Sequence, residues 1–175
     1  MSPIVFALSV PGSFSDGMPY GGGKDNSSDL YASHQWTKYD ERITLKCSTK
    51  QEGINSISSI YNSWYADRKW QFGCKQYVSS DTTVTCTESG YVNGYDDLID
   101  YMCGDNKYIN QLYSVHSNYE EDRRWKITCC SAEKFATAYH RLTSRVNDYD
   151  QNMDFVVNSD EVMMGLHSIH RNEYE

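Results

Sequence analysis

The chain has 175 residues and a formal net charge of −8 at pH 7, a length that suits a single domain with its own hydrophobic core. The net negative charge argues against nucleic-acid binding, which needs a basic stripe. It also disfavours binding to heparin-type chains or anionic membranes, except through a local basic patch. No apolar run reaches the roughly 18–20 residues of a transmembrane helix, so the sequence predicts no membrane span.

The aromatic composition favours β-strands. Tyrosine accounts for 15 residues and tryptophan for 4, against 5 phenylalanines, and such amphipathic rings suit strands and half-buried surfaces. Helix-forming residues are few and no long stretch has a 3.6-residue period, whereas scattered Ser, Thr, Asn and Gly are typical of polar turns. The sequence therefore predicts an all-β fold of short strands.

The first 35 residues are expected to form an N-terminal segment that precedes the folded domain. Residues 3–10 are apolar, but they are too short and lack the basic start of a complete signal peptide, so they are either a remnant of one or a first strand. Residues 11–33 are rich in Gly, Ser and Asp, which predicts a flexible arm. This arm carries the chain's only N-glycosylation sequence, at Asn26.

An internal repeat organises the remainder of the chain. The motif Asp-Arg-x-Trp-x-(Phe/Ile)-x-Cys at residues 67–74 returns at residues 122–129, 55 residues later (122 − 67 = 55). A similar lead-in precedes each copy, and a third lead-in begins at Leu166 without the motif after it. Such periodicity indicates repeated units that close on one another. We expect a compact, disulfide-linked, pseudo-threefold (trefoil-like) domain over residues 36–175, with repeats at about 36–90, 91–145 and, incomplete, 146–175.

Read as a strand, the motif has one buried face. Because side chains alternate along a strand, Arg68, Trp70, Phe72 and Cys74 share a face that suits a core. The arginine can then lie on the indole ring and bind a carboxylate, for which the Tyr-Asp pair that opens each repeat is a candidate, unless that aspartate only caps its own turn. A ligand site built from the same arginines is the alternative. The proposed structural residues are Asp67, Arg68, Trp70, Asp122, Arg123 and Trp125.

The six cysteines predict three disulfides and an oxidising compartment, because no Cys-x-x-Cys pair offers zinc spacing. Cys47 and Cys74 are expected to close the first repeat. Cys103 can pair with Cys129, which has the same position in its motif as Cys74 has in the first motif. It can also pair with Cys130, which would repeat the separation of 27 residues found in the first repeat. We prefer Cys103–Cys130 with Cys86–Cys129, and the other pairing stays open.

The sequence predicts neither a catalytic residue nor a bound metal or cofactor. It contains no Gly-x-Ser-x-Gly, phosphate-binding or His-Glu-x-x-His motif, and its adjacent carboxylates face apart on a strand. His167 and His170 are three residues apart and would point to opposite strand faces. His116 matches His170 in repeat register and is expected to pack at the end of its lead-in strand or to line a sugar site.

The polar loops before each Asp-Arg-x-Trp position are the candidate binding sites. Each loop carries an aromatic ring, and asparagine, carboxylate and aromatic groups together are what saccharide recognition uses, although ordinary loops also contain these residue types. The candidate ligand-binding residues are Asn62, Trp64, Tyr65, Asn118, Tyr119, Glu121, Asn172 and Tyr174.

The repeated motif, with its Cys129-Cys130 ending and the Tyr-Asp repeat openings, resembles the dermatopontin family from about Trp36 to Glu175. This resemblance implies a secreted, non-enzymatic extracellular-matrix or adhesion protein that binds matrix glycoproteins, proteoglycans or collagen-like partners and self-associates. It also adds weight to our preferred disulfide pairing. Alternatives are a carbohydrate-binding lectin that uses the loops before each motif, and a secreted toxin or effector.

The sequence departs from the family where a third Asp-Arg-x-Trp strand would follow Glu175. Without that strand the third lead-in would expose an unpaired edge and an apolar face. We therefore expect another segment to supply it, such as a cleaved C-terminal piece, a neighbouring subunit or a further length of chain.

Overall fold

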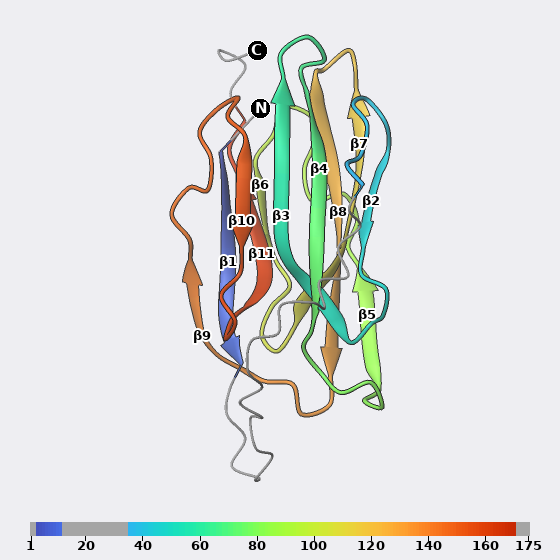
Figure 1. The fold of residues 1–175 in the computed structure, drawn as a ribbon, viewed down its shortest axis with the longest axis vertical. Coiled ribbons are helices and arrows are strands. Elements are labelled where there is room, and N and C mark those ends of the chain that lie inside the picture. The colour runs from blue at the N-terminus through green and yellow to red at the C-terminus, as the bar shows by residue number, and fades with distance from the viewer. Residues whose placement is uncertain (1–2, 12–34, 171–175) are drawn as a thin grey trace.

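A computed structural model describes residues 3–11 and 35–170, and these residues form eleven β-strands and no helix (Figure 1). The all-β prediction is confirmed, and none of the described residues belongs to a helix that could cross a membrane. The glycine-rich arm with Asn26, and the candidates Asn172 and Tyr174, lie outside the described residues. The strands are β1 Ile4–Pro11, β2 Ile43–Lys46, β3 Glu52–Asn62, β4 Asp67–Gln76, β5 Val84–Glu88, β6 Ile99–Met102, β7 Tyr108–Ser117, β8 Asp122–Ala132, β9 Thr137–Leu142, β10 Met153–Val156 and β11 Val162–Ser168.

The strands run mostly along the long axis of the molecule (Figure 1) and form three sheets. Their orders are β6-β11-β1-β9, β10-β3-β4 and β2-β7-β8-β5. The inward face of each motif strand joins the main core, which includes Trp70, Trp125 and Phe6. A second apolar cluster packs around Tyr108 and Phe135. The trefoil-like arrangement of the repeats itself stays a prediction.

Strand β1 completes the third repeat. In the antiparallel pairs β3–β4, β7–β8 and β11–β1, the register partners are Ser59 with Trp70, Ser114 with Trp125, and Ser168 with Ile4. Ile4 therefore occupies the tryptophan position of the motif. Two residues on, Phe6 pairs with Leu166 as Phe72 pairs with Ile57. The N-terminal strand thus lies where the third motif strand was missing.

The hydrogen bonds around this position repeat as well. The main-chain amide of the residue in the tryptophan position donates to a side-chain oxygen from the residues that open its repeat. These bonds are Trp70 to Thr37 at 2.8 Å, Trp125 to Asn93 at 2.8 Å, and Ile4 to Asn147 at 2.9 Å. The close approach of β1 also explains Gly165, where an added Cβ would lie 2.8 Å from the Ala7 side chain.

These contacts correct two expectations. The strand that completes the third repeat comes from the N-terminus of the same chain, and not from a C-terminal piece, a neighbouring subunit or a further length of chain. Residues 3–10 contain a first strand, so the boundary at residue 35 wrongly separated β1 from the domain into which it is built. Both edges of β11 are paired, with β1 on one side and β6 on the other.

All six cysteines form disulfides, and the structure pairs Cys47–Cys74, Cys103–Cys129 and Cys86–Cys130. Our preferred pairing of Cys103 with Cys130 and Cys86 with Cys129 is therefore wrong, and motif register was the better guide. Neighbouring residues on a strand face opposite sides. Cys129 faces the main core, while Cys130 faces the second cluster and lies opposite Cys86 on β5.

Candidate functional site

The motif arginines are interior residues, each with 1% of its surface exposed. The guanidinium of Arg123 donates from Nε to Asp67 Oδ1 at 2.6 Å and from Nη2 to Asp67 Oδ2 at 2.5 Å. Asp67 is fully buried. The carboxylate that holds Arg123 thus belongs to the first motif and not to a Tyr-Asp pair, and the two motifs are joined by a buried bidentate ion pair.

The arginines do not lie on the tryptophans as expected. Trp70 and Trp125 contact each other edge-to-face, with ring centroids 5.2 Å apart and a 78° angle between the planes. The guanidinium of Arg68 instead lies 5.4 Å from the ring centroid of Tyr61. The indoles therefore complete the core where two repeats meet, a preferred geometry for aromatic pairs.

The aspartates of the Tyr-Asp pairs are turn residues. Asp40, Asp96 and Asp150 have positive φ angles of 59°, 56° and 56°, a conformation that aspartate tolerates better than most residues. The main-chain amide of Asp40 donates to Asp67 Oδ2 at 2.8 Å, and that of Asp96 to Asp122 Oδ2 at 2.9 Å. Each of these two turns therefore supports the carboxylate of the motif that follows it.

Two histidines lie beside these carboxylates, an arrangement that the sequence analysis missed. His116 groups with Asp40 and Asp67, and His170 groups with Asp96 and Asp122, with one ligand-type atom of each residue within 4.8 Å of the others. The signal was present in the sequence, because the three residues of the first group and the three of the second occupy corresponding positions in successive repeats. The repeat register of His116 and His170 alone does not indicate which aspartates lie beside them, because those contacts join different segments of the chain.

Neither group is arranged as an open metal site. In the first, Arg123 already binds both oxygens of Asp67. In the second, the imidazole of His170 lies between two carboxylates, with Nε2 3.5 Å from Asp96 Oδ1 and Nδ1 3.8 Å from Asp122 Oδ1, so the two acids face different nitrogens. Burial raises the pKa of Asp122, and main-chain hydrogen bonds oppose that shift. We therefore interpret both groups as packed polar clusters and not as metal sites.

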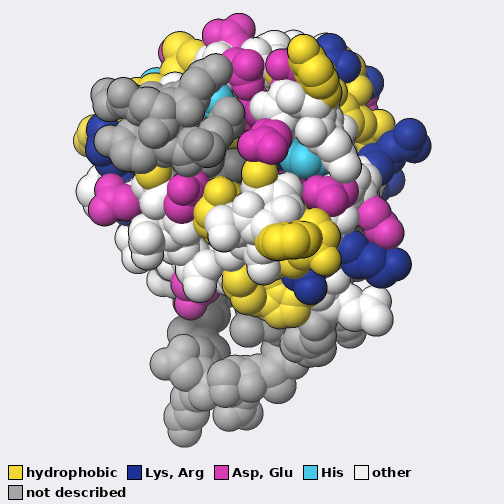
Figure 2. Space-filling model, turned by 90° about the horizontal axis from the view of Figure 1, so that it is seen from above, with side chains coloured by type: hydrophobic (Ala, Val, Ile, Leu, Met, Phe, Trp, Pro, Cys, Tyr) yellow, Lys and Arg dark blue, Asp and Glu magenta, His cyan; other side chains and the backbone are white. Residues whose placement is uncertain are grey.

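The loops 62–66 and 117–121 are the turns of the β3–β4 and β7–β8 hairpins, and both lie at the same end of the molecule (Figure 1). We call their described candidates the tip surface: Asn62, Trp64, Tyr65, Asn118, Tyr119 and Glu121. Figure 2 looks onto this end and shows hydrophobic side chains lying among acidic and basic ones.

The tip surface presents two aromatic rings almost wholly to solvent. Trp64 is 89% exposed and Tyr119 is 90% exposed. Asn62 Oδ1 accepts a hydrogen bond from the main-chain amide of Trp64 at 2.9 Å, which stabilises the first turn. In the second turn, Asn118 Oδ1 lies 3.2 Å from His116 Nδ1. The rings are therefore displayed by ordered hairpin turns.

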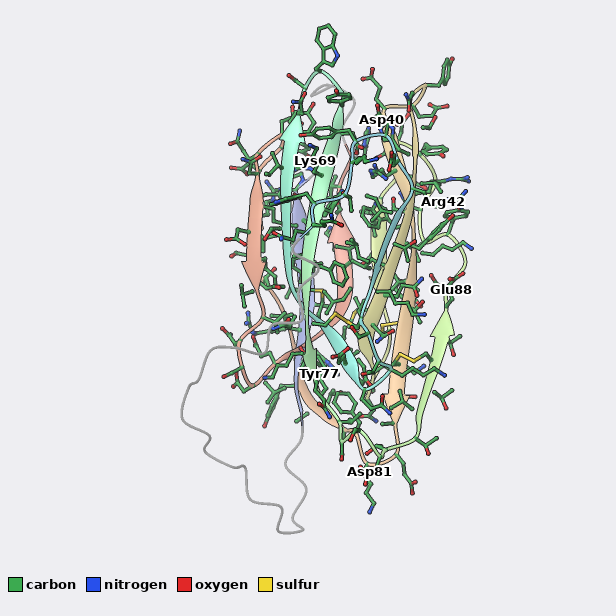
Figure 3. All side chains as sticks on the ribbon, turned by 45° about the vertical axis from the view of Figure 1, so that its right-hand side comes forward. Asp40, Arg42, Lys69, Tyr77, Asp81 and Glu88 are labelled. Carbon is green, nitrogen blue, oxygen red and sulfur yellow. A yellow bond between two sulfur atoms is a disulfide. The ribbon has the colours of Figure 1, made fainter. Side chains whose placement is uncertain are left out.

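Tyr65 is half-covered and extends the tip surface toward β4. Its ring stacks on Tyr39 with centroids 4.5 Å apart and an angle of 9°, and the ammonium of Lys69 lies 4.7 Å from the Tyr39 centroid. Figure 3 shows Lys69 and Asp40 at this end of the molecule.

A second surface combines cations with tyrosine rings on the outer face of β8. The guanidinium of Arg124 lies 4.3 Å from the Tyr91 centroid and 4.6 Å from that of Tyr95. Lys126 lies 5.2 Å from Tyr91 and 5.6 Å from Tyr113. We call these five residues the basic–aromatic face. Because Arg68 and Arg123 are buried, the basic residues near the motifs that remain for surface contacts are Lys69, Arg124 and Lys126.

A model of the protein family described as Dermatopontin matches residues 37–175. The hemagglutinin/amebocyte aggregation factor of Limulus polyphemus is 34% identical over 151 residues, which cover 85% of this chain and 86% of the relative. Millepora cytotoxin-1 of Millepora dichotoma is 32% identical over 138 residues, 79% of this chain and 60% of the relative. A dermatopontin of Biomphalaria glabrata is 32% identical over 122 residues, 70% and 80% respectively. No solved structure matches the chain.

Proposed function

The chain belongs to the dermatopontin family, and from this premise we propose that it is a secreted, non-enzymatic adhesion protein that binds a matrix glycoprotein or proteoglycan through its tip surface. Three disulfides support an extracellular location, since such bonds persist in oxidising compartments. The agglutinating and aggregating relative from Limulus polyphemus supports adhesion.

The observation that carries the proposal is the exposure of Trp64 and Tyr119 on two neighbouring hairpin tips. Large aromatic rings are usually at least half-buried in a folded chain, and exposed ones contribute little to its stability. Tryptophan and tyrosine are also the residues most often found at the energetic centre of protein interfaces. Two such rings at one end are therefore best explained as contacts for a partner.

The basic–aromatic face supports a proteoglycan among the partners. The protein is acidic overall, yet Arg124 and Lys126 are held over tyrosine rings on one outer strand face. Cation–π contacts position such charges, and a local cluster can attract a sulfated chain in spite of the net charge.

A carbohydrate-binding lectin is the second candidate, and the composition of the tip surface favours it. Each described tip carries an asparagine and an exposed ring, Asn62 with Trp64 and Asn118 with Tyr119, so groups for hydrogen bonds to hydroxyls and a flat stacking face occur together. For a toxin or effector role, the support is the resemblance to Millepora cytotoxin-1, and that role stays an expectation.

The adhesion protein and the lectin differ in whether the partner must carry a specific saccharide. We expect the disulfide-intact protein to bind immobilised matrix glycoprotein and proteoglycan, and to keep most of its binding to the glycoprotein after N-glycans are removed enzymatically. Loss of binding after that treatment, together with inhibition by a free saccharide on a glycan array, would favour the lectin. Failure to bind any matrix component or glycan would contradict both candidates.

A further inference from the structure

A cavity of about 50 Å³ lies where the three repeats meet. Its lining includes Ile4, Trp70, Trp125, Asp122 and Arg68. A single water needs roughly 10–15 Å³ of such space, so the cavity holds more than one water-sized group but is too small for a sugar ring. It is distinct from the tip surface and from the basic–aromatic face.

Arg68 brings a positive charge to this cavity, and no carboxylate among the described residues is hydrogen-bonded to it. Its Nη1 donates to two neutral acceptors, Ser59 Oγ at 3.2 Å and the carbonyl oxygen of Gln151 at 2.6 Å. Among the described residues, Arg68 Nη2 and Trp70 Nε1 are buried donors with no hydrogen-bond partner. Burying donors without acceptors is unfavourable, and both of these residues line the same cavity.

Burial lowers the pKa of Arg68 to about 10, while the negative charge of Asp150 opposes that shift. The guanidinium therefore remains protonated at neutral pH. A buried charge is stabilised when it is paired and hydrogen-bonded, so the cavity side of Arg68 favours an acceptor that carries negative charge.

The sister arginine shows what such an acceptor looks like. Arg123 Nη1 donates to the carbonyl oxygen of Glu41 at 3.1 Å, which corresponds in repeat position to the bond from Arg68 to Gln151. The remaining edge of Arg123, formed by Nε and Nη2, binds the Asp67 carboxylate. Arg68 thus reproduces the main-chain bond of Arg123 and lacks its carboxylate.

Register explains why β1 supplies no carboxylate there. In each complete motif the aspartate stands three positions before the tryptophan, and in β1 the tryptophan position is taken by Ile4. Three positions before Ile4 the sequence has Met1, which carries no acid. The motif aspartate of the third repeat is therefore absent from β1, the strand that replaces the third motif.

We propose that the cavity beside Arg68 binds a small singly charged carboxylate, of the size of formate or acetate, in the place that Asp67 takes at Arg123. Arg68 Nη2 and Trp70 Nε1 would donate to its oxygens. Asp97 and Asp122 also line the cavity, so a ligand with two negative charges would be repelled more strongly than a singly charged one. A bound carboxylate would connect β4 to the repeat completed by β1 and stabilise the fold by mass action.

The proposal is tested with formate and the disulfide-intact full chain, at an ionic strength held constant by sodium HEPES, whose anion is too large for the cavity. Saturation-transfer NMR on the formate proton should give a saturable signal, and formate should raise the melting temperature over the same concentration range. Arg68→Met should weaken binding at least tenfold. Arg42→Met, which removes an exposed arginine on the outside of the molecule (Figure 3), should leave binding unchanged.

If Arg68→Met does not fold, Trp70→Phe removes the second donor and keeps an aromatic ring, and it should weaken formate binding several-fold. Wild-type protein that gives no saturable signal would overturn the proposal. Equal formate affinity in wild type and in the folded member of these two variants would overturn it as well.

Discussion

Replacing Asp67 by asparagine is expected to lower the free energy of unfolding by about 3–5 kcal/mol, because the change leaves the guanidinium of Arg123 charged and unpaired in the interior. Asparagine has nearly the same shape as aspartate, so the loss of stability results from the missing charge and not from a change in side-chain volume. Both partners are almost fully buried and are joined by two hydrogen bonds. Denaturant unfolding with the disulfides intact measures the effect.

The matched control is Glu88→Gln, which removes the carboxylate of a surface ion pair. Glu88 Oε1 lies 3.1 Å from Lys126 Nζ, and both side chains are partly exposed to solvent. Such pairs contribute at most about 1 kcal/mol. If Asp67→Asn were as mild as this control, the ion pair between the two motifs would not support the fold.

Phe6→Ala is expected to destabilise the protein by about 3–5 kcal/mol, the range for removing a large buried ring. Phe6 is 1% exposed and stacks on Phe155 with centroids 4.7 Å apart. It occupies in β1 the position that Phe72 has in β4. The expected loss follows only if the N-terminal strand is part of the core, and thermal or denaturant unfolding measures it.

Val5→Ala provides the comparison on the same strand. Val5 is half-buried on the opposite face of β1, so its truncation should cost about 1 kcal/mol, near the average for point mutations. Equal, small effects of the two substitutions would show that β1 does not complete the third repeat.

The strand content and the repeats could be predicted because each leaves a local pattern. The motif at residues 67–74 and its copy at 122–129 predicted two hairpins in register, and both motif strands begin at the predicted residue and end within three residues of these bounds. Strand β1 carries none of the polar landmarks. Ile4, Phe6 and Leu8 keep only the apolar alternation of the motif, which residues 3–10 share with many unrelated segments.

The interior partners of the arginines could not be predicted, because they depend on contacts between repeats. Asp67 and Arg123 are 56 residues apart, and only the packing of one hairpin against the next brings them together. The tip loops were easier to identify, since a polar loop between two strand patterns is expected to be exposed. The exposure of Trp64 and Tyr119 agrees with that expectation, while their role in binding stays a prediction.

The most direct measurement of the proposed adhesion role is the affinity of the double variant Trp64→Ala/Tyr119→Ala for immobilised matrix glycoprotein and proteoglycan. Both rings are exposed, so its melting temperature should match wild type. Its affinity should fall at least tenfold, or by about 1.4 kcal/mol. Tyr139→Ala, which removes a 77% exposed tyrosine on β9, should bind like wild type. Unchanged affinity in the double variant would contradict the assignment of binding to the tip surface.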